Sequence, residues 1–375
     1  MQLKNFMGFK VQVPYVDLGS QWLAIKDRAI PKISDVLESG MYLEHPIVNS
    51  LEERIANKLG VKFATSVNSG TDALIFALAA LEVTRGDEVI TVPNSYIASV
   101  AAIEHIGATT VFIDVGPDHL MDTEMIEQAI TSKTKAIMPV HLEGKMADMV
   151  SINRIAKQHG LMIIEDAAQA FGSKFLDYQP GSLSDVACFS FHPLKNLNAA
   201  GDGGLVVANN YELIEKVRNL KNHGQSSRNV SNRFGFVSRL DSIQAVILDI
   251  KLDELDSTIT RRRSNADFYD EHFYNLDIQK PIFLPEIFHS YHLYVIEMDN
   301  RDGIQKALSD VGIETKIHYP ILIVDQKAYR NKYPTKKWHL PTAEKQSKKI
   351  LSLPIHQNLS EIQLEYVTEQ LARLV

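Results

Sequence analysis

The chain has 375 residues, with 39 Lys or Arg against 46 Asp or Glu, so its formal net charge is −7. This acidic balance argues against a nucleic-acid partner, and the basic clusters Arg261–Arg263 and Lys348–Lys349 are too short to form such a surface. Both clusters are expected to be solvated helix faces. Single hydrophobic cores rarely grow beyond about 250 to 300 residues, so the length predicts one large and one smaller domain.

The cysteine content indicates a reducing compartment, and the lengths of the apolar runs argue against a membrane span. Cys188 is the sole cysteine, which excludes an intrachain disulfide or a Cys-rich zinc site, and it is expected in a buried strand. The segment Met1–Lys10 lacks the apolar core of a signal peptide, and no run approaches the roughly 18 apolar residues of a membrane helix. We therefore expect a soluble, cytoplasmic protein with no membrane partner.

Short apolar runs alternate with helical patterns between residues 50 and 250. The clearest runs are Glu88–Val92, Thr110–Asp114, Ala136–Val140 and Leu161–Glu165. Such alternation predicts an α/β fold built from βαβ units around a mainly parallel sheet.

Two further runs, Asp185–Ser190 and Gly204–Ala208, lie too close together for a helical crossover. They are therefore expected to pair antiparallel, with Lys195 on the loop between them.

The pattern changes after residue 250. A long charged helix is expected over Lys251–His272, followed by mixed strands and helices and an amphipathic segment, Ser360–Leu374. We place a large domain at residues 1–250 and a small domain at 251–375, with the N-terminal segment packed on the small domain. The cleft between two such domains is the default ligand site.

A candidate phosphate-binding segment, Asn68–Leu74, lies between the predicted strand Phe63–Val67 and a predicted helix, Ala73–Leu81. Gly70 permits close backbone approach, Thr71 offers a hydroxyl, and the free N–H groups at a helix start attract a phosphate. An ordinary Ser, Thr or Asp helix cap would explain the same segment.

Lys195 and Asp166 together suggest pyridoxal phosphate chemistry. A pyridoxal enzyme needs an amine that forms a Schiff base with the cofactor, and a carboxylate that keeps the pyridine nitrogen protonated. Lys195 follows a proline among apolar residues that can desolvate its amine, and Asp166 ends an apolar strand, where α/β sheets place ligands. Their alternatives are a solvated loop lysine and a helix cap.

Three further side chains could complete such a site. Gln169, one turn after Asp166, can donate a hydrogen bond to the phenolate oxygen of the cofactor, and Tyr96 can cover the pyridine ring, although an aromatic residue there can equally belong to the core. His192 lies three residues before Lys195, but no second histidine stands at ligand spacing, so we expect no metal site.

Six segments resemble the DegT/StrS family of sugar aminotransferases, in family order and over nearly the whole chain. These segments are Asn68–Leu74, Glu165–Gln169, Ser190–Asn196, Gly201–Gly204, Ser238–Ala245 and His318–Pro320. The family belongs to fold type I, the aspartate aminotransferase class of pyridoxal phosphate enzymes. The resemblance therefore implies a mainly parallel, seven-stranded-type sheet sandwiched by helices, with a smaller α+β C-terminal domain.

The resemblance also implies roles for individual residues. Lys195 is the Schiff-base lysine, Asp166 the pyridinium partner, Gln169 the phenolate neighbour and Tyr96 a ring-stacking residue. The phosphate contacts that it implies are Gly70, Thr71 and Ser190.

Arg239 and His318 occupy positions that the family uses near the sugar or its diphosphate. Their alternatives are a structural ion pair and a capped loop histidine.

The activity implied by the resemblance is transfer of the amino group of L-glutamate to a keto sugar. The expected acceptor is a nucleotide-linked 3-keto or 4-keto deoxysugar, for amino-sugar and polysaccharide biosynthesis such as that of a lipopolysaccharide O-antigen. The family works as homodimers with shared active sites, in which a segment matching Gly235–Arg239 crosses from the second subunit.

The chain departs from the family pattern at three places. Val237 stands where the crossing segment has an Asn that helps to hold the cofactor phosphate, Glu143 stands where a Tyr is frequent, and Glu44-His45 replaces Leu-Gly. The last two changes concern the sugar pocket.

Two rival functions remain. One is a sugar dehydratase of the same family, whose members replace the lysine with histidine. The other is a non-catalytic, cofactor-binding regulator, which fits better with a missing lysine or an attached DNA-binding module. The presence of Lys195 argues against both.

Overall fold

The computed structural model describes residues 12–282 and 284–375. The segment Met1–Lys10, judged above to lack a signal peptide, lies outside the described residues. A central sheet contains the strands β1 (Phe63–Val67), β2 (Glu88–Thr91), β3 (Thr109–Phe112), β4 (Thr134–Ile137), β5 (Met162–Asp166), β7 (Val186–Ser190) and β8 (Gly204–Ala208). The shorter pairs are β6 (Lys174–Phe175) with β11 (Ile287–Phe288), β9 (Gln225–Ser227) with β10 (Val230–Ser231), and β12 (Tyr294–Glu297) with β13 (Ile350–Leu353).

Helices connect and cover these strands. In the first half of the chain they are α1 (Leu18–Ser39), α2 (Pro46–Leu59), α3 (Gly70–Ala80), α4 (Ala98–His105), α5 (Ile126–Ala129) and α6 (Met149–His159). In the second half they are α7 (Tyr211–Leu220), α8 (Ser242–His272), α9 (Arg301–Asp310), α10 (Lys327–Lys332), α11 (Pro341–Lys349) and α12 (Glu361–Ala372).

The central sheet has the strand order β1-β8-β7-β5-β4-β2-β3. The pairs from β7 to β3 are parallel, whereas β8 runs antiparallel to both β7 and β1. The prediction of a mainly parallel sheet with an antiparallel pair flanking the Lys195 loop is therefore confirmed.

Helices cover both faces of the sheet because its strands bury alternate residues on opposite sides. Val206 packs with α3, α4 and α7, whereas its neighbour Val207 packs with α2 and the first part of α8. The neighbouring residues Ile163 and Ile164 of β5 also face opposite sides of the sheet. Ile163 packs with α6, whereas Ile164 packs with α3, α4 and α7. The predicted three-layer α/β architecture is thus observed.

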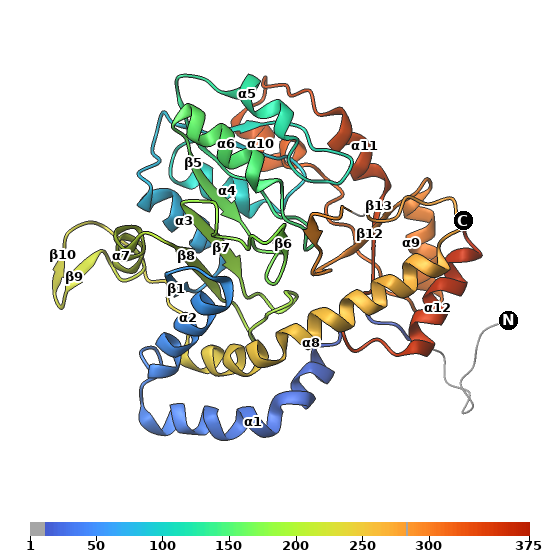
Figure 1. Cartoon of the computed structure of the whole chain (residues 1–375), viewed down its shortest axis with the longest axis horizontal. Helices are drawn as coiled ribbons and strands as arrows, with labels where there is room; N and C mark the ends of the chain where they lie inside the picture. Colours follow the sequence, from blue (N-terminus) through green and yellow to red (C-terminus); the bar gives the residue numbers. More distant parts are fainter. Residues whose placement is uncertain (1–11, 283) are drawn as a thin grey trace.

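Helix α8 extends from the central sheet to a second core (Figure 1). Its C-terminal half contributes Ala266, Tyr269 and Phe273 to a cluster with β12, β13, α9 and α12. Val13 belongs to the same cluster and bridges to Ile313. The expected boundary at residue 250 falls inside α8 and stays a prediction.

One segment of the C-terminal part returns to the large domain. Tyr329 of α10 packs edge-on against Phe112 of β3, and Ala343 of α11 belongs to the hydrophobic cluster that contains both rings. The C-terminal segment therefore contacts both cores.

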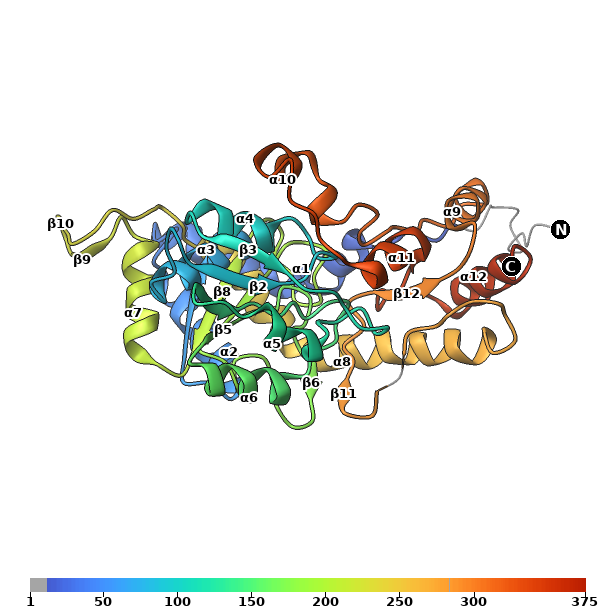
Figure 2. The same ribbon diagram turned by 90° about the horizontal axis from the view of Figure 1, so that it is seen from above.

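The strands β9 and β10 form an arm that projects from the large domain beyond α7, at the end opposite to α9 and α12 (Figures 1 and 2). Within the described residues, no helix is both long and apolar enough to cross a membrane.

Candidate active site

A cavity of about 500 Å³ lies beside the carboxyl ends of β5 and β7. Four of its lining residues, Gly70, Thr71, Ser190 and Asp166, come from the start of α3 and from the ends of these strands. The loops and turns add Tyr96, Gln169, Lys195 and His318. Eight of the nine site residues predicted from the sequence therefore meet at one cavity.

Lys195 lies on the loop between β7 and β8, as predicted, and its backbone N–H donates to the carbonyl of His192 at 2.9 Å. Burial lowers the pKa of the Lys195 amine to about 8, against the opposing effect of the Asp166 carboxylate. The amine therefore loses its proton more readily than that of an exposed lysine, as a nucleophile or a base requires.

Asp166 is the last residue of β5, and its side chain is almost fully buried. One carboxylate oxygen accepts a hydrogen bond from the hydroxyl of Ser99 at 2.6 Å, and the other accepts from the backbone N–H of Ala168 at 3.2 Å. Ser99 is a buried residue of α4, and no motif in the sequence pointed to it. These two bonds fix the direction in which the carboxylate faces the cavity.

The start of α3 has features of both alternatives for the Asn68–Leu74 segment, a phosphate-binding helix start and an ordinary helix cap. Ser69 is the N-cap and accepts from the backbone N–H of Asp72 at 3.1 Å, so the ordinary helix cap is present. Ser69, Gly70 and Thr71 nevertheless line the cavity. A Cβ added to Gly70 would lie 2.8 Å from Cβ of Ser190, so glycine permits the close approach of α3 and β7.

Gln169 is held by two hydrogen bonds. Its Oε1 accepts from the backbone N–H of Glu143 at 2.8 Å, and its Nε2 donates to the hydroxyl of Tyr319 at 3.2 Å. The Tyr319 ring lies 5.7 Å from that of Tyr96, which is about half exposed. The amide orientation therefore follows from the Glu143 N–H, which can only donate.

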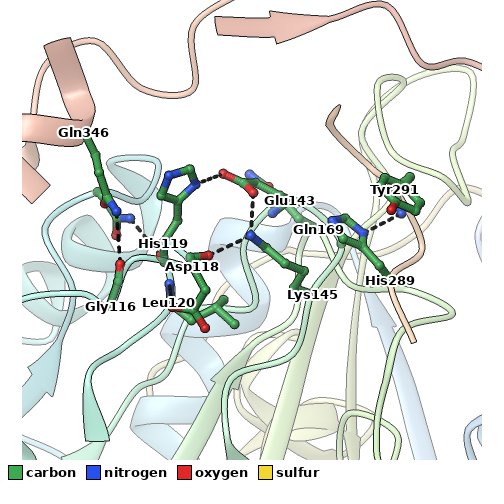
Figure 3. Close-up of polar contacts among 12 residues, drawn as sticks. Gly116, Asp118, His119, Leu120, Glu143, Lys145, Gln169, His289, Tyr291 and Gln346 are labelled. Atoms are coloured by element: carbon green, nitrogen blue, oxygen red, sulfur yellow. Dashed lines mark hydrogen bonds and ion pairs between the residues drawn. The ribbon is translucent and has the colours of Figure 1, made fainter. Parts of the chain in front are cut away.

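A buried cluster of charges lies behind Gln169 (Figure 3). His119 contacts Glu143 through Nδ1 at 2.6 Å and Glu297 of β12 through Nε2 at 3.0 Å. The Lys145 ammonium pairs with Glu143 at 2.8 Å and donates to the carbonyl of Asp118 at 2.7 Å. The cluster joins the large domain to the small one.

His119 is held in the charged form in this cluster. Burial is the largest single effect and opposes the charge, but the carboxylate of Glu143 and the hydrogen bonds to Glu143 and Glu297 together outweigh it and raise the pKa of His119 to about 9. Both ring nitrogens face carboxylates, which suits an imidazolium with two N–H donors. Glu143, identified from the sequence as a departure from the family pattern, is thus part of a charge-balanced group.

His318 lines the cavity beside Lys195. Its Nδ1 lies 2.9 Å from the hydroxyl of Ser352, and burial lowers the pKa of its ring to about 4, so the imidazole is neutral. Arg239 does not line the cavity of its own chain. Its assignment to the substrate stays a prediction, because the resemblance concerns a site shared with a second subunit.

The expectation that Arg261–Arg263 forms a solvated helix face is wrong for Arg262. Its side chain is only 3% exposed and lines the cavity, whereas Arg261 is exposed. The reason is helical periodicity, since Ile259, Arg262, Ala266 and Tyr269 recur every three to four residues and are all buried. The helical spacing of the apolar residues before and after Arg262 is the sequence signal that indicates its burial.

The cavity fits pyridoxal phosphate. It offers a buried amine of lowered pKa at Lys195, a fixed carboxylate at Asp166 and a helix start lined by Gly70 and Thr71 for the phosphate.

Solved structures of similar proteins agree with this fold and cofactor. The chain superposes on "ntda from bacillus subtilis with bound cofactor pmp", the amine form of pyridoxal phosphate, with a TM-score of 0.91, 30% identity and coverage of 99% of this chain and 86% of that one. It superposes on S. venezuelae DesV in complex with a ketimine intermediate with a TM-score of 0.93, 38% identity and coverage of 97% and 98%.

The sequence comparisons give the family. A curated relative from Acidithiobacillus ferrooxidans, named UDP-N-acetyl-3-dehydro-alpha-D-glucosamine 3-aminotransferase, is 40% identical over 96% of this chain and 97% of its own length. Residues 24–372 match the DegT/DnrJ/EryC1/StrS aminotransferase family. The chain therefore belongs to this family and is a sugar aminotransferase that uses pyridoxal phosphate.

Proposed function

We propose that the protein transfers the amino group of L-glutamate to a nucleotide-linked 3-keto or 4-keto deoxysugar. The observation that carries the proposal is the meeting of the Lys195 amine, the Asp166 carboxylate and the start of α3 at one cavity. The name of the Acidithiobacillus relative supports a keto group at carbon 3 of a UDP-linked sugar. The amino sugar produced would serve polysaccharide synthesis, such as that of an O-antigen, in the cytoplasm.

The side chains of the cavity divide the work. Pyridoxal phosphate supplies a carbonyl carbon that takes up amines and a ring that withdraws electrons from the substrate carbon. Lys195 would hold the cofactor through Nζ and, with a pKa of about 8, would accept the α-proton of the donor and pass it to the carbonyl carbon that the cofactor supplies. Asp166 would pair with the pyridine nitrogen of the bound cofactor, and Gln169 would donate to its phenolic oxygen.

The remaining assignments concern the phosphate, the ring and the sugar. Gly70, Thr71 and Ser190 are placed to bind the cofactor phosphate, and Tyr96 to cover its ring. Neutral His318 can hydrogen-bond a sugar hydroxyl or carbonyl at the cavity wall. We assign Arg239 to the sugar diphosphate of a neighbouring subunit.

A homodimer with shared sites is part of this proposal. The arm of β9 and β10 projects away from the body of the protomer (Figure 2), and exposed apolar side chains lie on it and on the segment that follows it: Val230, Phe234, Phe236 and Val237. An exposed apolar group of this kind is typical of a surface that a partner covers. Arg239 follows this arm in the chain, and we infer that it reaches the site of a second subunit.

The function is tested by incubating the pyridoxal phosphate form with L-glutamate and with UDP- or dTDP-linked 3-keto and 4-keto sugars. Mass spectrometry should detect an amino sugar and an equal amount of 2-oxoglutarate with the wild type, and neither with Lys195→Ala. A deoxysugar formed without amination would instead support the dehydratase. Absence of any sugar product across the panel would contradict the proposed acceptor class.

A further inference from the structure

Arg262 is a buried cation that no step of the proposed mechanism uses. It lies in the middle of α8, lines the cavity and is 3% exposed. Isolated charges are costly to bury, so a buried guanidinium normally has an anionic partner. Such a partner should therefore be sought either in the protein or in the cavity.

The hydrogen bonds of Arg262 use only some of the N–H donors of its guanidinium. Nη1 donates to the carbonyl oxygens of Tyr291 at 3.0 Å and His292 at 3.4 Å. Nε is buried without a partner, and within residues 12–282 and 284–375 Nη2 has no acceptor either. A guanidinium has five N–H donors, so most of its capacity remains unused.

Within the part of the chain that the structure describes, no carboxylate is paired with Arg262. Two acidic side chains, Asp166 and Asp202, line the cavity, and among the described residues neither they nor any other carboxylate forms an ion pair with Arg262. Burial raises the pKa of nearby Tyr15, which therefore stays a neutral phenol.

The histidines around Arg262 leave its charge uncompensated. Burial lowers the pKa of His292 well below its usual range and that of His356 to about 4, so both rings are neutral. Burial also lowers the pKa of Arg262 itself, to about 10, which still leaves the guanidinium protonated at neutral pH. Because Tyr15, His292 and His356 are neutral, they leave the positive charge of Arg262 unbalanced.

Arg262 and Lys195 line the same cavity as His292. The charges of both residues act on the His292 ring, and both side chains line the cavity near it. The amino acid that donates nitrogen must bring its α-carbon to the Lys195 amine, and its α-carboxylate is one bond from that carbon. A carboxylate matches the planar fork of a guanidinium.

We propose that Arg262 binds the α-carboxylate of the amino-acid donor. This inference rests on the proposed function and adds to it the residue that positions the donor. The site accepts α-amino acids as a class, because the α-carboxylate is common to all of them. Selection of glutamate by its γ-carboxylate would fall to other residues.

Equilibrium binding of α-methyl-L-glutamate tests the proposal without turnover, because this ligand lacks the α-proton. Its dissociation constant is measured from the absorption change of the bound cofactor. Arg262→Gln should weaken binding about a hundredfold, and Arg262→Lys about tenfold, since lysine keeps the charge but loses the fork. Cofactor affinity and thermal stability are measured on the same samples.

Arg263→Gln is the matched control. Arg263 is the next residue of α8 and donates to the carbonyl of His289 at 2.8 Å, so it holds the same neighbouring segment without lining the cavity. Its substitution should change binding less than about threefold. If Arg263→Gln weakens binding as much as Arg262→Gln, the effect comes from loosening residues 289–292, and the proposal is wrong.

The α-amide of L-glutamate isolates the carboxylate itself. The wild type should discriminate strongly against this amide in a single-turnover reaction, and Arg262→Gln should discriminate little. Equal discrimination by both proteins would overturn the assignment. If Arg262→Gln fails to fold, Arg262→Lys is compared in its place.

Failure of the proposed function has a different signature. A wild type that ignores L-glutamate but reacts with L-alanine or L-aspartate would refute glutamate as donor. The test of Arg262 then proceeds with that amino acid and its α-amide. Unchanged affinity for the reacting amino acid in Arg262→Gln would refute the role of Arg262 alone.

Discussion

Asp166 is fixed before any ligand arrives, because Ser99 and the backbone of Ala168 bind its two oxygens. A preoriented charge loses no energy to reorganisation when it stabilises a cation. The residue therefore matters for turnover more than for folding.

We expect Asp166→Ala to slow the half-reaction with L-glutamate by about a hundredfold or more, because the negative charge at the pyridine nitrogen is lost. Asp166→Glu keeps the charge and should lose less. Rapid-mixing absorption spectroscopy measures both rates. Equal rates for Asp166→Ala and the wild type would remove the proposed role.

His119 gives the protein a pH-dependent stability. Its pKa rises from 6.5 to about 9 on folding, so its contribution is complete below pH 6.5 and disappears as the pH rises through about 9. The free energy of unfolding should therefore fall by on the order of 3 kcal/mol across this window. Urea unfolding at several pH values measures the change.

His119→Asn should flatten this pH dependence and lower the stability at pH 7, since Glu143 and Glu297 would lose the cation between them. His105→Asn, at an exposed position of α4, should leave the slope as it is. An unchanged slope in His119→Asn would show that the interdomain cluster does not contain the titrating group.

The start of α3 is the element that we propose for the cofactor phosphate. Gly70→Ala would place a methyl group 2.8 Å from Cβ of Ser190 and push α3 away from β7. We expect the dissociation constant of pyridoxal phosphate to rise at least about tenfold, as measured by titration of the cofactor-free protein.

Gly19→Ala is the control for this change. Gly19 also lies in the first turn of a helix, α1, and an added Cβ would meet only the Asp17 side chain at 3.7 Å. Its cofactor affinity should equal that of the wild type. Undiminished affinity in Gly70→Ala would contradict the phosphate site.

The sheet could be predicted from the sequence because its strands are short apolar runs with clear ends. The antiparallel pairing of β7 and β8 followed from the short connection between them. The start of α8 was placed at Lys251 but lies at Ser242, because residues 245–250 are all buried and show no polar face. Periodicity cannot distinguish a buried helix of this kind from other apolar segments.

The site was predictable to the extent that single residues carry its chemistry. Lys195 and Asp166 are recognisable by residue type and local sequence. The cluster of His119, Glu143 and Glu297 was not, because its members come from separate segments and each resembles an ordinary polar residue. Only the folded chain brings them together.

At the scale of the whole molecule, the cavity is lined by residues from distant parts of the chain. Lys195 and Asp166 come from the central sheet and its loops, whereas Arg262 comes from α8, His318 from the C-terminal part of the chain and Tyr15 from its N-terminal segment, and all five line the cavity. The proposed dimer would add Arg239 from a second chain through the projecting arm (Figure 2).

Complementation of two inactive variants tests this shared site. Lys195→Ala and Arg239→Ala, mixed after reversible dissociation, should regain about a quarter of wild-type activity, since half of the dimers are mixed and each has one intact site. Lys195→Ala mixed with Asp166→Ala should regain none, because both residues belong to one chain's cavity. Equal recovery in the two mixtures, or none in either, would contradict the assignment of Arg239.

The measurement that tests the central claim most directly is the absorption spectrum of the purified protein with pyridoxal phosphate, before and after addition of L-glutamate. We expect a yellow band that requires Lys195 and disappears with glutamate as 2-oxoglutarate accumulates. A band that persists with glutamate would contradict the proposed donor. The absence of any band would contradict the role of Lys195 and, with it, the account of the cavity.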